Sequence, residues 1–168
     1  MQGILEHLLE HRVSPQWRGF LEALATEFAD QLDHDELRQL MARVGARFAA
    51  ARPLPHCEST NDLASALNAQ WREAQWGYVE LVDEHDFLRI THYAAPLRAF
   101  GDGALEWSPA FLQGAYQAWF DTLGAAGLRV AQEASPENDS RIELRIERQT
   151  AARQTVRERA HGNARAKD

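Results

Sequence analysis

The apolar residues near the N-terminus recur at helical spacing and predict two helices. In residues 3–12 the apolar positions are 4, 5, 8 and 9, which gives a short amphipathic helix. A second helix begins after Ser14, because serine is a favoured N-cap and Pro15 suits the first helical position. The stripe that this helix is expected to turn toward the core consists of Trp17, Phe20, Leu21, Leu24, Phe28 and Leu32.

Two further helices are predicted from capping boxes. Asp33 precedes Glu36, and Ser59 precedes Asp62, so each pair places a capping side chain three residues before an acid that can reach back to it. Gly45 lies inside the third helix, where glycine costs about 1 kcal/mol relative to alanine. A close contact with another helix would offset this cost. The apolar positions are Leu37, Leu40, Met41, Val44 and Phe48 in the third helix, and Leu63, Leu67 and Trp71 in the fourth.

The second half of the chain contains segments in which apolar and polar residues alternate. This pattern predicts strands within residues 77–93, 128–133 and 141–147, with a turn at 136–139 between the last two. In the last strand Ile142, Leu144 and Ile146 face one way and the charged residues between them face the other.

One more helix is predicted between the two hairpins. It begins at 107–109, with Trp107 and Leu112 in the positions of a hydrophobic staple, and it ends at Gly124 and Gly127. The fold class that follows is α+β: N-terminal helices, then two antiparallel β-hairpins separated by a long helix, forming one antiparallel sheet with helices packed on it.

The stretch DEHDFLRITH, residues 83–92, raises the question of a metal or acid–base site, because it holds three carboxylates and two histidines. We interpret 83–86 as a loop, which places Glu80 opposite Arg89 as an ion pair between the strands. His85 then lies in the turn and His92 roughly 20 Å along the strand, so they cannot share a metal. We therefore interpret the acidic residues as part of a solvent-exposed turn rather than as a metal or acid–base site.

Composition is that of one soluble domain, with 168 residues, 45% hydrophobic and 26% charged. We expect a single domain over residues 1–150 and a disordered basic tail over 151–168. The formal charge of −7 disfavours nucleic acid as a partner. The N-terminus has no secretory pattern and no run of about 20 apolar residues, so we expect a cytoplasmic protein that does not span the membrane.

Other combinations of reactive residues have simpler explanations. His7 and His11 have the spacing of HExxH, but the sequence is HLLEH. Cys57 follows His56 directly, and adjacent residues rarely form a nucleophile and its base. Neither a phosphate-binding glycine loop nor a CxxC pair is present in the sequence. We therefore predict no enzyme activity, no catalytic residue, no metal site and no cofactor.

Five tryptophans in 168 residues is a high number. They fit a packed core, but tryptophan and tyrosine also favour subunit interfaces and carbohydrate stacking. The aromatic residues that we select as interface candidates are Trp71, Trp76, Tyr78, Tyr116 and Trp119.

Two motifs carry a resemblance to a known family. The segment NAQWREAQWGYVELVDEHDFLRITH, which contains WGYV at 76–79, and the helix WSPAFLQGAYQAWF resemble the cellulose synthase operon protein D family. These proteins are the small D subunits of bacterial cellulose synthase complexes. The resemblance covers roughly residues 17–147.

The resemblance implies an accessory role without catalysis. It implies a homo-oligomer, in which dimers assemble into a ring-shaped octamer, that assists export or ordering of nascent β-1,4-glucan chains beside the synthase. A proline-rich accessory protein is a further implied partner for some members, and accounts of the family leave the periplasm open as the compartment. An internal passage lined by N-terminal residues is also implied, with glucan-contact candidates Gln2, Glu6, His7 and Glu10.

A second hypothesis is a small-molecule or haem-binding sensor domain, with a pocket between helices and sheet and a histidine as the haem ligand. A hydrolase is a third, but the sequence offers no pair of carboxylates that we would assign to it.

Overall fold

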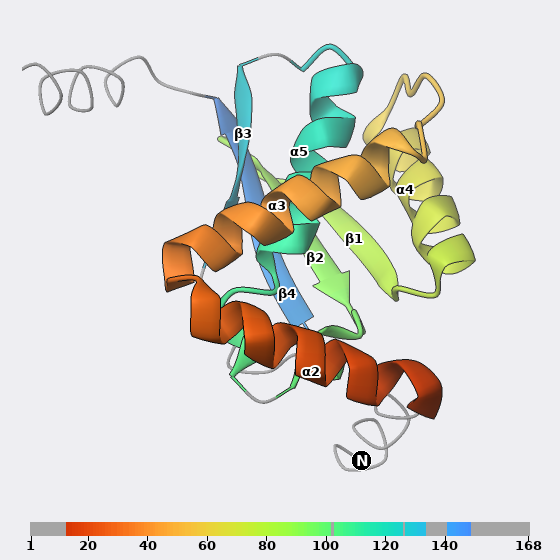
Figure 1. The fold of residues 1–168 in the computed structure, drawn as a ribbon. Helices are drawn as coiled ribbons and strands as arrows, with labels where there is room; N and C mark the ends of the chain where they lie inside the picture. The colour runs from red at the N-terminus through yellow and green to blue at the C-terminus, as the bar shows by residue number, and fades with distance from the viewer. Residues whose placement is uncertain (1–12, 102, 126, 134–140, 149–168) are drawn as a thin grey trace, which may run out of the picture.

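The computed structural model describes residues 13–101, 103–125, 127–133 and 141–148. The predicted helix at 3–12, the turn at 136–139 and the tail at 151–168 lie outside this range. The elements, drawn in Figure 1, are α2 (Pro15–Gln31), α3 (His34–Ala50), α4 (Thr60–Ala74), β1 (Tyr78–Asp83), β2 (Leu88–Tyr93), η1 (Leu97–Phe100), η2 (Ala104–Glu106), α5 (Ala110–Thr122), β3 (Leu128–Gln132) and β4 (Arg141–Arg148).

The strands form one four-stranded antiparallel sheet in the order β1-β2-β4-β3. The two hairpins are therefore joined through β2 and β4, and α5 connects them. Figure 1 shows α3 and α5 in front of the sheet, α4 beside β1, and α2 crossing the lower end. The predicted α+β class, with helices packed on one antiparallel sheet, is confirmed.

The first hairpin has the predicted faces but not the predicted register. Val79 and Ile90 are buried, as the alternation requires. Glu80, however, lies opposite Thr91 rather than Arg89, because the loop comprises residues 84–87 and the pairing is shifted by two positions. A shift of two preserves the side-chain faces, whereas a shift of one would invert them. The ion pair predicted between Glu80 and Arg89 is therefore wrong.

Local capping signals determine where the helices begin. Both predicted capping boxes are present: Asp33 accepts from the Glu36 N–H at 2.9 Å, and Ser59 accepts from the Asp62 N–H at 3.1 Å. Helix α2 begins at the predicted proline, but the Ser14 side chain makes no capping hydrogen bond. Proline at the first helical position is thus the local signal that the structure uses there.

Helices α3 and α5 cross with their backbones in direct contact. A Cβ on Gly45 would lie 1.9 Å from the Phe111 carbonyl oxygen, and a Cβ on Gly114 would lie 2.0 Å from the Ala42 carbonyl oxygen. The close contact expected for Gly45 is confirmed, and Gly114 supplies its counterpart on α5. This contact fixes how far α5 stands from α3 and so sets the thickness of the helical layer.

Amide side chains occupy both edges of the sheet. On β1 the Asn68 side chain donates to the Val79 carbonyl and accepts from the Val79 N–H, both at 2.8 Å. On β3 Gln117 accepts from the Val130 N–H at 2.8 Å, and Gln113 donates to the Val130 carbonyl at 3.0 Å. An unpaired strand edge is a template for pairing with another chain, and these amides occupy one residue of each edge, near the start of β1 and at the middle of β3.

Helix α2 packs less deeply than its stripe predicts. Ala25 is its only buried residue, and Phe28 and Leu32 contact the core from partly buried positions. Trp17 and Phe20 remain 54% and 55% exposed. The expectation that the whole stripe faces the core is therefore wrong for the N-terminal half of the helix.

The contact between α3 and α5 predicts opposite outcomes for the same substitution at different glycines. Gly45→Ala or Gly114→Ala forces a methyl group onto a carbonyl oxygen, and we expect a loss of more than about 2 kcal/mol in the free energy of unfolding. Gly19→Ala in α2 meets nothing within 4 Å and should gain up to about 1 kcal/mol. Urea denaturation measures all three. Equal effects at the three positions would contradict the close contact.

Candidate functional site

The DEHD segment forms a tight connection between β1 and β2. Asp83 ends β1, and the Glu84 N–H donates to the Phe87 carbonyl at 3.0 Å. Arg89 pairs with Glu84 at 2.8 Å, so this arginine has a different partner from the predicted Glu80. His85 is exposed in the turn, whereas His92 lies in the core at the other end of β2. The two histidines thus belong to different environments.

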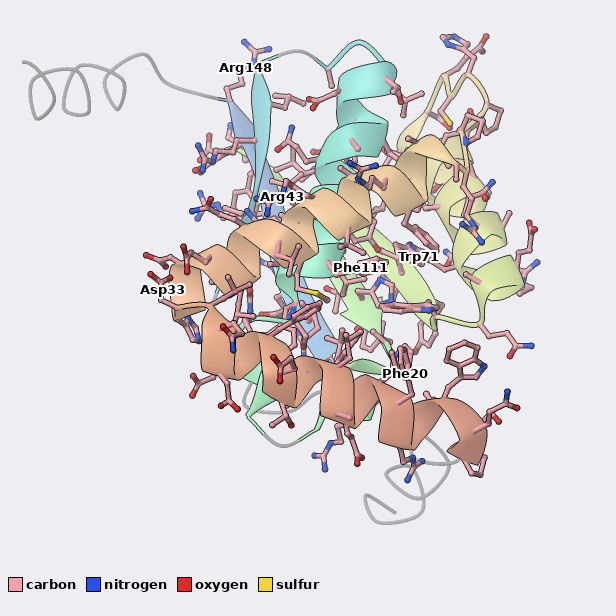
Figure 2. The ribbon with its side chains drawn as sticks, in the orientation of Figure 1. Phe20, Asp33, Arg43, Trp71, Phe111 and Arg148 are labelled. Atoms are coloured by element: carbon pink, nitrogen blue, oxygen red, sulfur yellow. The ribbon has the colours of Figure 1, made fainter. Side chains whose placement is uncertain are left out.

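A chain of buried hydrogen bonds links three layers of the molecule. The Trp71 indole N–H on α4 donates to the Tyr116 hydroxyl on α5 at 3.0 Å. His92 on β2 then joins the Tyr116 hydroxyl through Nδ1 and the Trp76 carbonyl through Nε2, both at 2.7 Å. We call these four residues the Trp–Tyr–His relay. Figure 2 shows Trp71 pointing from α4 into the space between the helices and the sheet.

The relay requires one protonation state of the histidine. A carbonyl oxygen only accepts, so His92 Nε2 carries the proton and its Nδ1 accepts from the Tyr116 hydroxyl. Burial lowers the pKa of His92 to about 4, against a smaller raising effect of the Trp76 carbonyl. Burial also raises the pKa of Tyr116 well above its usual value. Both groups are neutral at pH 7, and the Trp71 indole N–H, the Tyr116 hydroxyl and both His92 ring nitrogens each have a partner.

The predicted aromatic interface candidates divide into two sets. Trp71, Tyr116 and Trp119 are at most 1% exposed, and they lie in this chain's own core, where no neighbouring copy can reach them. Trp76 is half-buried against Phe111, with ring centroids 4.4 Å apart. Tyr78 is 51% exposed on the outer face of the sheet. An interface role therefore stays a prediction only for Trp76 and Tyr78.

The predicted glucan-contact residues Gln2, Glu6, His7 and Glu10 lie outside the described residues. A groove of about 750 Å³ lies between α2 and the η1–η2 segment. Val13, the first described residue, is part of its lining. No sequence pattern indicates this groove, because its walls come from segments about 70 residues apart.

The groove is lined by both apolar and charged side chains. The apolar ones include Ala99, Phe100 and Trp107, and the charged ones are Arg18, Glu22, Asp30, Arg98 and Glu106. His34 and Glu106 pair across one end at 3.1 Å, and Arg38 donates to the Glu106 carbonyl at 2.9 Å. Charges of both signs beside aromatic side chains suit a neutral ligand that carries many hydroxyl groups.

The Trp–Tyr–His relay predicts a specific acid sensitivity. The folded-state pKa of His92 lies below its ordinary 6.5, so the stability due to the neutral ring is complete above pH 6.5 and is lost as the pH falls toward about 4. His92→Gln keeps one donor and one acceptor but does not titrate. Urea denaturation from pH 7 to pH 4 should cost the parent up to about 3 kcal/mol more than this variant. Parallel pH profiles for the two proteins would contradict this role of His92.

Comparison with known proteins places the chain in a family. The family model for the D subunit of cellulose synthase matches residues 4–147. Proteins named cellulose synthase operon protein D from Komagataeibacter xylinus and Komagataeibacter sucrofermentans are each 32% identical over 115 residues, which is 67% of this chain and 74% of theirs. Another protein of that name from Komagataeibacter xylinus is 30% identical over the same length.

These matches confirm the resemblance seen in WGYV and in the LQGAY helix. The structure gives both motifs a physical role: Trp76 and Tyr116 belong to the relay, Gly114 lets α5 approach α3, and Asn68 binds Val79 at the sheet edge. Among the described helices, none is long and apolar enough to cross a bilayer. The chain belongs to the cellulose synthase operon protein D family.

Proposed function

We propose that this protein is a non-catalytic accessory subunit of the bacterial cellulose synthase complex. It would assist export, alignment or crystallisation of nascent β-1,4-glucan chains as a ring-shaped oligomer of up to eight copies. The observation that carries the proposal is the family match over residues 4–147, which includes nearly all of the described fold. A proline-rich accessory protein is a further partner in this proposal.

The buried polar side chains of the relay are engaged in hydrogen bonds, which supports a non-catalytic role. Both ring nitrogens of His92 are engaged, and the Tyr116 hydroxyl serves as both acceptor and donor within the relay. A general acid or base must instead be free to exchange a proton with a substrate. The relay therefore acts as structural support that joins α4 and α5 to the sheet.

The proposal assigns glucan handling to the groove, which Val13 helps to line, and to the N-terminal glucan-contact candidates. Hydroxyl groups along a glucan can exchange hydrogen bonds among Glu22, Asp30 and the two arginines that line the groove. Contacts of this kind are weak and numerous, which lets a chain move while it stays aligned. In this proposal Gln2, Glu6, His7 and Glu10, which lie outside the described residues, also contact glucan.

The groove also favours a second candidate function, binding of a small molecule by a regulatory domain. A volume of about 750 Å³ is within the range of ligand pockets. A haem ligand role for His92 would break two buried hydrogen bonds of 2.7 Å, so this version has less support than a polar ligand in the groove.

Deletion of the coding gene in its host tests the proposed function. We expect cellulose yield or crystallinity to fall, and glucan synthesis by isolated membranes to continue, because the protein acts after polymerisation. Crystallinity is measured by X-ray diffraction of the washed product, and the intact gene supplied in trans is the control. Unchanged cellulose after deletion, or polymerisation or cleavage of glucan by the purified chain alone, would refute the proposal.

A further inference from the structure

The N-terminal half of α2 presents an apolar surface that the described part of the chain leaves open. Trp17 and Phe20 are more than half exposed, and Leu21 and Leu24 do not join the core that Phe28 and Leu32 contact. Figure 2 shows Phe20 on the side of α2 that is turned toward the sheet. On α3 Val44 is also exposed, at 42%.

Ring geometry argues against a carbohydrate platform at this surface. The Trp17 and Phe20 rings meet edge to face, at an interplanar angle of 78° and a centroid distance of 5.8 Å. A linear glucan stacks its flat faces on rings that lie in one plane, whereas an edge-to-face pair forms a compact apolar projection. An exposed apolar pair that includes tryptophan is typical of a protein interface.

The blocked sheet edges direct association toward the helices. Asn68 occupies the outward backbone groups of Val79 near the start of β1, and Gln117 occupies the Val130 N–H at the middle of β3, so strand pairing between copies at these positions would first have to displace the amides. The exposed helical surface needs no such displacement.

Charge identifies a second copy of the same chain as the occupant. Helix α2 carries three acids and one arginine, whereas α3 from Leu37 onward carries three arginines and no acid. Glu27 lies two turns after Phe20 and Arg47 one turn after Val44, so each charge is on the same face of its helix as the exposed apolar residue. Neither charge has an ion-pair partner among the described residues.

We infer that the Trp17–Phe20 surface of α2 packs against the Val44 side of α3 in a second copy, with Glu27 of one copy beside Arg47 of the other. Each chain holds both halves of this contact, so copies can close into a symmetric assembly. The inference rests on the proposed oligomer and names the surface that forms it.

The first test compares α2 variants of the full chain by sedimentation velocity over a range of concentrations. Trp17→Ala with Phe20→Ala should weaken association by at least about 30-fold, as expected for a tryptophan at the centre of an interface. Val82→Ala is the matched control, because Val82 is 46% exposed but lies on the sheet. It should leave association unchanged. The α2 variant should melt at the same temperature as the dilute parent chain.

The second test reverses the charges. Glu27→Arg and Arg47→Glu should each weaken association by about tenfold or more, because like charges then face one another. An equimolar mixture of the two variants should associate as the parent does, since each copy complements the other. If a substitution instead weakened association by disturbing the fold of its own chain, mixing the two variants would not restore association.

Five results would overturn the inference. Association that the α2 substitutions do not affect, or a charge-variant mixture no better than its components, would exclude this surface while leaving the proposed oligomer intact. Loss of retention on cellulose with association unchanged would assign the surface to glucan. A lower melting temperature of the dilute α2 variant would show that its own chain covers the surface. A parent chain that is monomeric at every concentration would overturn the proposed oligomer as well.

Discussion

The Trp–Tyr–His relay is the interaction on which the rest of the structure depends. It runs from α4 through α5 to β2 and ends on the carbonyl of Trp76, shortly before β1. Each member is both a hydrogen-bonding group and part of the aromatic core, in which the Trp71 ring stacks on Phe48 at 5.3 Å. A buried network of this kind specifies one arrangement of its elements, because any other arrangement leaves a buried polar atom without a partner.

The two motifs that carry the family resemblance are the segments that the relay holds together. Gly77 follows Trp76 with φ +88°, and a Cβ there would lie 1.9 Å from the Tyr93 carbonyl oxygen, so the chain can turn into β1 only with glycine. In the helix, Gly114 and Tyr116 serve the contact with α3 and the relay respectively. The residues of the two family motifs thus have roles in packing and in buried hydrogen bonds.

Helices and strands could be predicted because their signals are local in the sequence. The hairpin register, the burial of the aromatic residues and the groove could not, because they depend on tertiary contacts. The capping boxes at Asp33 and Ser59 and the alternating strand residues act over a few positions, so the sequence reveals them. Loop length is not contained in the alternation, which is why the predicted register of the first hairpin is displaced by two. A count of aromatic residues cannot separate core from interface, so Trp71 is an interface candidate by sequence although it is fully buried. The groove escapes prediction because α2 and η1 meet only in the folded chain.

Amide side chains occupy one residue on each edge of the sheet, and the first described helix carries exposed aromatic side chains, a combination that suits assembly through the helices. The mass of the purified full chain in solution, measured by light scattering coupled to gel filtration, tests this view most directly. We predict a discrete multiple of the 19.0 kDa chain, up to eight copies, that persists on dilution into the micromolar range. A mass of one chain at all accessible concentrations would contradict the account.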